Sequence, residues 1–224
     1  EPSKEMRNEF HGWDDWADSL AEVAEGRPVV FVNTYQLPSK YAFYAGGQGI
    51  SLNNSTNPGN QYDLWPQREA ELQGEEVVFF HSSIGGPDSF EMEGFDRTLY
   101  RIMTDFHSYN TLQCRLDQAP EVVDPGVTIR MMSYWYTEGG LDVRVPEGER
   151  LELEYLIMTP AHEIVSRGVV KDSFPYKKLA AGEEYPLDVA IPMPEQPGEY
   201  KCRLTLDNGF FRHLNMPFWM FEVE

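Results

Sequence analysis

Cysteine is scarce in this chain. Among its 224 residues only Cys114 and Cys202 are cysteines. Two cysteines exclude a disulfide-dense small domain and a zinc site built from several thiolates. They leave two states open, a single Cys114–Cys202 disulfide or two separate buried thiols, and we favour the two thiols.

Basic residues and long apolar runs are also few. The sequence has 18 Lys and Arg against 37 Asp and Glu, which gives a formal net charge of −19. Such a surface repels phosphate backbones and anionic headgroups, so nucleic acid and peripheral membrane binding are disfavoured, and the charge is expected to serve solubility. No apolar run approaches the ~20 residues of a membrane helix, and no basic segment followed by an apolar stretch opens the chain.

The short motifs of nucleotide, metal and hydrolase chemistry are missing as well. There is no GxxxxGKS/T and no GxSxG. The glycine cluster at 45–49 follows a predicted helix rather than a strand, and the cluster at 84–87 precedes acidic residues, so neither favours a dinucleotide. The five histidines are scattered, and none lies in an HExxH motif. We therefore predict no cofactor and no metal, and the sequence identifies no catalytic residue.

The first half of the chain has helical and strand patterns in alternation. Apolar residues recur at helical spacing over 13–25, where Gly26 and Pro28 end the helix. The β-branched run 28–34 predicts a strand buried on both faces, as in a parallel sheet. The other expected elements are a helix over 38–46, a strand at 49–53, a short helix over 66–74, a strand at 75–82, an irregular loop at 84–94 and an extended segment at 99–109. Residues 1–109, with a linker at 1–11, are thus predicted to form a small α/β module, Rossmann-like with a partly parallel sheet.

From about residue 110 the helical periods stop, and short strands follow at regular spacing between Pro and Gly turns. About seven to eight strands over ~115 residues predict an antiparallel, immunoglobulin-like (Ig-like) β-sandwich at 110–224. Tyr200 precedes Cys202 by two positions at a strand start, which is the spacing of the tyrosine corner in Ig-like domains. The predicted fold class is therefore α/β + β.

Amide and aromatic side chains gather at two places in the first module. The first set, at the carboxyl end of the first strand and on the next helix, is Asn33, Tyr35, Gln36 and Tyr44. The second set, in the following loop, is Asn60, Gln61, Tyr62, Asp63 and Trp65. Ligands of open α/β sheets collect at strand ends, and sugars are bound by amides, carboxylates and aromatic faces. The alternative is a loop held by its own hydrogen bonds, with Trp65 in the core and Tyr44 only packing its helix.

The same stretch carries a resemblance to a family. Its motifs are the strand end Asn33-Thr34-Tyr35-Gln36, the helix positions Ser39, Tyr41, Phe43 and Tyr44, and the loop NQYDLW at 60–65. Over about residues 13–82 the chain resembles the soluble tail that follows the membrane helices in bacterial glycosyltransferase family 39 proteins. These are the protein O-mannosyltransferase-like enzymes and their lipid-modifying relatives.

The resemblance implies a membrane enzyme that moves a sugar from a polyprenyl-phosphate carrier to a lipid or protein acceptor. The acidic catalytic residues of that family lie between membrane helices, none of which is present in this sequence, so the fragment alone is expected to be inactive. Its partners would be the membrane-embedded part of the same polypeptide and a glycan or lipid-linked sugar, without nucleic acid, and its location would be periplasmic. Two alternatives stay open: a secreted carbohydrate-binding or adhesion module, and a small α/β hydrolase-like enzyme for which no catalytic set can be named.

Overall fold

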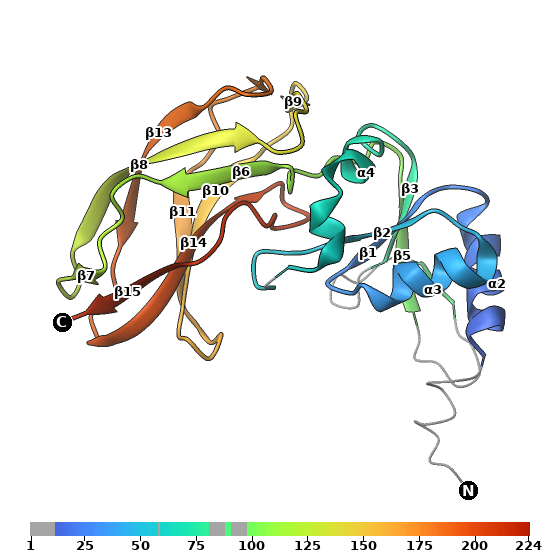
Figure 1. Cartoon of the computed structure of the whole chain (residues 1–224), viewed down its shortest axis with the longest axis horizontal. Helices are drawn as coiled ribbons and strands as arrows, with labels where there is room; N and C mark the ends of the chain where they lie inside the picture. The colour runs from blue at the N-terminus through green and yellow to red at the C-terminus, as the bar shows by residue number, and fades with distance from the viewer. Residues whose placement is uncertain (1–11, 58, 81–87, 91–97) are drawn as a thin grey trace, which may run out of the picture. The chain divides into compact units, whose positions relative to one another are not determined.

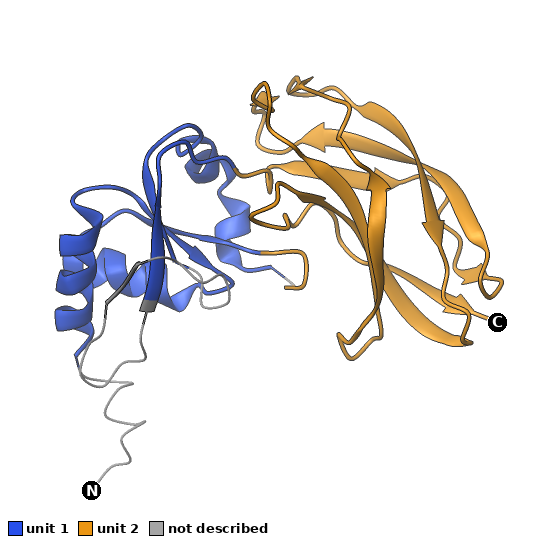
Figure 2. Cartoon of the chain, turned by 180° about the vertical axis from the view of Figure 1, so that it is seen from behind, with its two compact units in different colours: residues 1–53, 59–107 blue, residues 54–58, 108–224 orange. Residues whose placement is uncertain are grey.

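The chain forms two compact units. The structure is a computed structural model that describes residues 12–57, 59–80, 88–90 and 98–224. The first unit takes the described parts of 1–53 and 59–107, and the second takes those of 54–58 and 108–224 (Figure 2). Strands hold more residues than helices and form several sheets, which is the coarse form of the predicted fold. The linker expected at 1–11 and the glycine cluster at 84–87 lie outside the described residues.

The first unit contains one sheet and several helices. Its helices are α2 (Trp13–Ala24), α3 (Gln36–Ala45), the 3-10 helix η1 (Gln61–Leu64) and α4 (Pro66–Ala70), and its strands are β1 (Val29–Val32), β2 (Gly49–Leu52), β3 (Val77–Phe80), β4 (Asp88–Phe90) and β5 (Thr98–Met103). The strand order is β2-β1-β3-β5-β4. Strands β1, β2, β3 and β5 are labelled in Figure 1. Strand β1 runs parallel to β2 and β3, whereas β5 runs antiparallel to β3 and β4.

One part of the sequence prediction for this unit is wrong. The segment 84–94 was expected to be an irregular loop, but Asp88–Phe90 form strand β4. Its partner is β5, with Ser89 opposite Leu99. Asp88 and Ser89 are poor strand formers, and pairing with a neighbouring strand overrides that weak preference.

One face of α2 builds the core of the first unit. Trp16 and Leu20, one helical turn apart, are buried and join Phe31 of β1 and Phe80 of β3 in one apolar cluster. The rings of Phe31 and Phe80 stack with their centroids 5.5 Å apart. Each such buried side chain contributes roughly 1.5–3 kcal/mol to folding. Val29, Val30 and Phe31 of β1 are all buried, as its uninterrupted apolar run predicts.

The second unit is made of strands. They are β6 (Leu112–Leu116), β7 (Val122–Val123), β8 (Thr128–Thr137), β9 (Val143–Arg144), β10 (Glu152–Met158), β11 (Ile164–Lys171), β12 (Lys178–Leu179), β13 (Tyr185–Pro192), β14 (Gly198–Asp207) and β15 (Trp219–Val223). They form the sheets β11-β10-β14-β15-β7 and β13-β8-β6 and the small pair β12-β9. The two larger sheets share one apolar core, an arrangement compatible with a β-sandwich.

Both cysteines lie in that core, on different sheets. Cys114 belongs to β6 and Cys202 to β14, and each is a free, buried thiol. Burial raises the pKa of Cys202 to about 12 and also raises the pKa of Cys114. Because the thiolate is the reactive form, both are expected to be chemically inert in the folded chain. Of the two states left open by the sequence, the structure has the separate thiols.

Strand β7 departs from the expected antiparallel pattern. It pairs in parallel with β15, with Val122 opposite Glu222 and Val123 opposite Val223. Parallel neighbours need a long connection, and nearly a hundred residues separate these two strands in the chain. A pairing over such a distance leaves no trace in the local alternation of residues.

A buried histidine packs against the second core. His213 is 0% exposed, and its Nδ1 accepts a hydrogen bond from the backbone N–H of Tyr109 at 3.1 Å. The rings of Tyr109 and Phe211 flank the imidazole edge-on, with centroid distances of 5.2 and 5.0 Å. Burial lowers the pKa of His213 to about 3. The side chain is therefore neutral in the folded protein at pH 7.

We expect the protein to lose stability as the pH falls below about 6.5, the ordinary pKa of histidine. Unfolding lets His213 take up a proton that the folded state excludes until the pH approaches its lowered pKa of about 3. The variant His213→Asn keeps an acceptor near the Nδ1 position and does not titrate, so urea unfolding at pH 7 and pH 5 should show a smaller loss than in the unmodified chain. His162→Asn, at an exposed histidine, is the matched control. An equal loss in His213→Asn and the unmodified chain would contradict this assignment.

Candidate functional site

Asp63 lies at the centre of a polar network in the first unit. Its Oδ1 and Oδ2 accept hydrogen bonds from Asn53 Nδ2 at 2.9 and 2.7 Å, and Oδ2 also accepts one from the backbone N–H of Asn60 at 2.7 Å. The Nδ2 of Asn60 donates to Ser51 Oγ at 3.1 Å and to Asn53 Oδ1 at 3.0 Å. These bonds fasten the start of η1 to the carboxyl end of β2.

The local sequence explains this geometry. The side-chain oxygen of Asn60 accepts the backbone N–H of Tyr62 at 2.9 Å, while Asp63 accepts the N–H of Asn60, which together cap η1. Asn53 directly follows β2 and is 0% exposed, so its amide needs partners inside the protein. Hydrogen bonds to a carboxylate are among the stronger ones in proteins. Asn60 and Asp63 therefore hold the loop in place, and their hydrogen-bonding groups point inward.

The aromatic residues behave differently. Tyr35, Tyr44 and Trp65 expose 50%, 44% and 45% of their surface, and we call these three the aromatic surface. Trp65 therefore does not fill the core. Its ring meets that of Tyr62 edge-on at 5.5 Å between centroids, and the guanidinium of Arg68 lies 5.2 Å from the Trp65 ring centroid. Half of the indole is supported by protein, and half is available to a partner.

A chain of contacts links the aromatic surface to the polar network. Ser39 Oγ donates to the backbone oxygen of Tyr35 at 2.7 Å and lies 3.2 Å from the hydroxyl of Tyr62. Ser39 belongs to α3 and Tyr62 to η1, so this contact fastens the helix to the loop. Tyr44 lies on the last turns of α3, edge-on to Phe43 at 4.9 Å between centroids. The contacts thus tie Tyr35 and Trp65 to one framework, and α3 carries Tyr44.

The other predicted site residues lie around this framework. Asn33 follows β1 with a positive φ of 56°, and its backbone N–H donates to the oxygen of Leu52 at 2.9 Å. The side chains of Gln36 and Gln61 are exposed. Asn53 was missed by the sequence prediction, although it follows β2 in the way that Asn33 follows β1. Its matching position after a strand is the sequence signal by which Asn53 could have been found.

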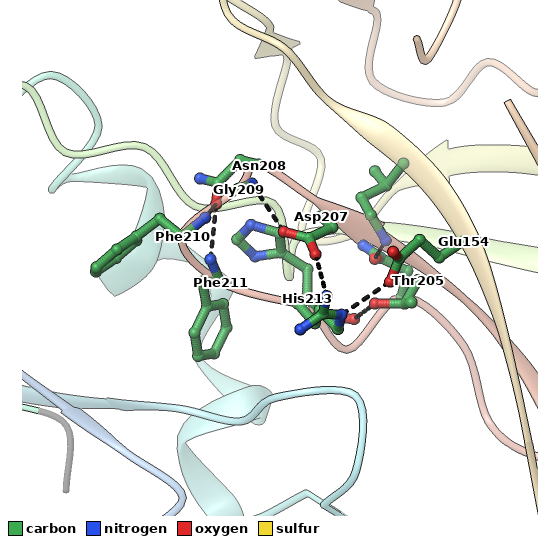
Figure 3. A network of polar contacts seen from close by, with 11 residues as sticks. Glu154, Thr205, Asp207, Asn208, Gly209, Phe210, Phe211 and His213 are labelled. Atoms are coloured by element: carbon green, nitrogen blue, oxygen red, sulfur yellow. Dashed lines mark hydrogen bonds and ion pairs between the residues drawn. The ribbon is translucent and has the colours of Figure 1, made fainter. Parts of the chain in front are cut away.

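A second polar network lies in the second unit, on the side of β10 and β14 that faces away from the core (Figure 3). Arg212 pairs with Glu154 and with Asp207, each at 2.8 Å. Thr205 Oγ1 donates to the backbone oxygen of His213 at 2.7 Å. Sequence analysis could not find this network, because its members lie far apart in the chain. Its two carboxylates are occupied by Arg212, so we assign the network a structural role.

Comparison with known proteins does not place the chain in a family. No family model and no curated protein matches it. Similar solved structures include the alkylpurine DNA glycosylase AlkC of Pseudomonas fluorescens bound to DNA with an abasic site analog (16% identity, 52% of this chain and 31% of that chain, TM-score 0.34), the sporulation control protein Spo0M of Bacillus subtilis (16%, 51% and 49%, 0.31) and the CARDB domain of PF1109 from Pyrococcus furiosus (19%, 51% and 93%, 0.31). The matched region spans less than half the length of the first two. At these TM-scores the similarities carry no argument about this chain.

No described helix combines the length and apolar character needed to cross a membrane. In the same part of the chain, no group of three or more His, Cys, Asp or Glu side chains is arranged to hold a metal ion.

The role of Asp63 can be tested by an isosteric change. Asp63→Asn removes the charge and replaces one acceptor by a donor that faces donors of Asn53 and Asn60. We expect a loss of about 1–3 kcal/mol in the free energy of unfolding, because a buried hydrogen-bonding group is left without a partner. Urea unfolding followed by circular dichroism measures it. Gln61→Asn, at an exposed neighbour, should stay within about 0.5 kcal/mol, and equal stability of the two variants would contradict the assignment.

Proposed function

We propose that this chain is the non-catalytic, extracytoplasmic region of a membrane glycosyltransferase that uses a polyprenyl-phosphate sugar donor, and that the aromatic surface binds a carbohydrate of the acceptor or donor. The observation that carries the proposal is the exposure of the rings at Tyr35, Tyr44 and Trp65, of which Tyr35 and Trp65 are tied through Ser39 and Tyr62 to an internally bonded loop. The family resemblance over about residues 13–82 supports it.

The chemistry of the surface suits a sugar. Sugar rings have an apolar face that packs on aromatic rings, and half-exposed Trp and Tyr side chains offer such faces without first being uncovered. Gln36 and Gln61 are exposed as well, and each amide offers donors and an acceptor for hydroxyl groups. The side chains of Asn60 and Asp63 already form hydrogen bonds within the protein. We therefore assign them the role of positioning the loop, not of contacting the ligand.

We also propose a specific fold type for each of the two units. We take the first unit as Rossmann-like, supported by the parallel strands β1, β2 and β3. We take the second as Ig-like, supported by the hydroxyl of Tyr200, which donates to the backbone oxygen of Gln196 at 2.9 Å as in a tyrosine corner. In this proposal the chain lies on the periplasmic side of the cytoplasmic membrane, next to the membrane-embedded part of the same polypeptide, and has no transferase activity by itself.

A second candidate is a secreted carbohydrate-binding or adhesion module. The same exposed rings favour it, since they suit a free glycan as well as a tethered one. The gene separates the two proposals. An open reading frame that encodes several membrane helices before this region supports the glycosyltransferase, whereas a signal peptide directly before it supports the secreted module.

Carbohydrate binding is tested with the purified chain on a glycan array, followed by saturation-transfer NMR with the best ligand. We expect Trp65→Ala and Tyr44→Ala each to weaken binding roughly threefold to tenfold, because one stacked ring contributes about 0.5–1.5 kcal/mol. Met220→Ala is the matched control, since Met220 is 53% exposed but lies on β15 of the second unit.

The result is decisive in either direction. Binding that is weakened by the two aromatic changes and kept in Met220→Ala supports the proposed surface. A folded Trp65→Ala and a folded Tyr44→Ala that bind as tightly as the unmodified chain would show that the glycan contacts another part of the protein.

A further inference from the structure

Strand β14 carries two buried cationic side chains close together in sequence. Lys201 and Arg203 are two positions apart on this strand, so their side chains leave the same face of the sheet, opposite to Cys202 in the core. Alternation predicts that this face meets water, yet only 5% of Lys201 and 2% of Arg203 is exposed. Charged side chains are rarely buried to this degree unless they are paired.

Toward the described residues, the guanidinium of Arg203 donates hydrogen bonds through Nη1 but not through Nε. Its Nη1 donates to the backbone oxygens of Ser55 and Asn57 at 2.9 and 3.2 Å. Its Nε is buried and has no hydrogen-bond partner among the described residues, and the hydroxyl of Ser55 is likewise buried without one. Arginine binds oxyanions side-on through Nε and the neighbouring Nη, and the Nε on this edge of Arg203 has no hydrogen-bond partner in the part of the chain that the structure describes.

A single aromatic ring joins both cations. The Cζ of Arg203 lies 3.6 Å and the Nζ of Lys201 lies 4.8 Å from the ring centroid of Phe218. The half-buried Phe218 also meets the exposed ring of His162 edge-on at 6.1 Å. Three basic side chains therefore surround one ring in a chain whose formal net charge is −19.

No carboxylate balances these charges within the part of the chain that the structure describes. Neither Lys201 nor Arg203 has an ion pair there, and Lys201 Nζ donates to the backbone oxygen of Pro160 at 3.1 Å. The nearby acids Glu154 and Asp207 are already paired with Arg212. Burial, followed by the charge of Arg203, lowers the pKa of Lys201, and burial lowers that of Arg203 to about 10. An uncompensated buried charge is costly, and a bound anion would remove that cost.

We propose that Lys201 and Arg203 form an anion site that takes a phosphate group. A phosphate monoester or inorganic phosphate carries about −1.5 to −2 charges at pH 7, which matches two cations better than a single carboxylate does. In this proposal its oxygens accept hydrogen bonds from the Nε of Arg203 and from the donors of Lys201 that Pro160 does not use. The site lies in the second unit and does not depend on the carbohydrate surface proposed above.

The test is isothermal titration of the full chain with inorganic phosphate, in a phosphate-free buffer of constant ionic strength. We expect one saturable site per chain. Lys201→Gln should weaken phosphate binding about tenfold or more, because it removes a charge-assisted hydrogen bond. Arg203→Lys keeps the charge but removes the side-on pair of donors, and it should weaken binding by a similar factor.

Controls keep the outcome interpretable. Arg130→Gln changes an exposed arginine on β8, whose side chain is 74% accessible, and should leave phosphate binding unchanged. If Arg203→Lys fails to fold by circular dichroism, Lys201→Gln alone decides. A parallel titration with glycerol phosphate shows which kind of phosphate the site prefers. Binding tighter than that of inorganic phosphate indicates a phosphate ester as the ligand, and weaker binding indicates the free ion. Absence of saturable binding of both at tens of millimolar, or binding by Lys201→Gln as tight as in the unmodified chain, would overturn the proposal.

Discussion

The carboxylate of Asp63 is the group on which the candidate site of the first unit depends. It accepts hydrogen bonds from Asn53 at the end of β2 and from Asn60 at the start of η1. Buried or half-buried polar groups need such partners, because each one left without them costs about 1–3 kcal/mol. The loop therefore adopts the conformation that satisfies its amides, and that conformation leaves Trp65 half exposed against Tyr62, whose hydroxyl lies 3.2 Å from Ser39 of α3. The exposure of Trp65 thus follows from the hydrogen bonds within the loop.

The same requirement shapes the second unit. Asn215 is 0% exposed, and its amide donates to the backbone oxygens of Tyr109 and Leu112 at 2.7 Å each, while its oxygen accepts the N–H of Leu206 at 2.8 Å. Arg203 departs from this requirement, since its buried Nε has no hydrogen-bond partner among the described residues, and the same holds there for the hydroxyls of Ser55 and Thr137 and for His213 Nε2. We place a ligand at Arg203 because its group is charged and shares the ring of Phe218 with a second buried cation, Lys201.

Sequence patterns predicted the locally encoded elements. The apolar spacing of Trp16 and Leu20 identified α2, and the run 28–34 identified β1. Alternation placed Cys202 inside, but it also implies that Lys201 and Arg203 face water, whereas segments distant in sequence cover them. Strand β4 and the parallel pairing of β7 also depend on distant partners, so residue type does not reveal them. For the candidate site, the amide-rich loop was visible in the sequence. Which of its residues hold the loop and which are exposed to a ligand became clear only from the hydrogen bonds in the structure.

Asp63 is inferred to hold the loop in its conformation before any ligand binds, so that Trp65 is already exposed in the free chain. Hydrogen exchange of the Asn60 backbone amide, followed by NMR in the ligand-free chain, tests it most directly, because that amide donates to Asp63 Oδ2 at 2.7 Å. We expect this exchange to be slowed at least about tenfold relative to an unstructured peptide. Exchange of this amide at the unstructured rate would contradict it, since the loop would then be open and the surface would form only on binding.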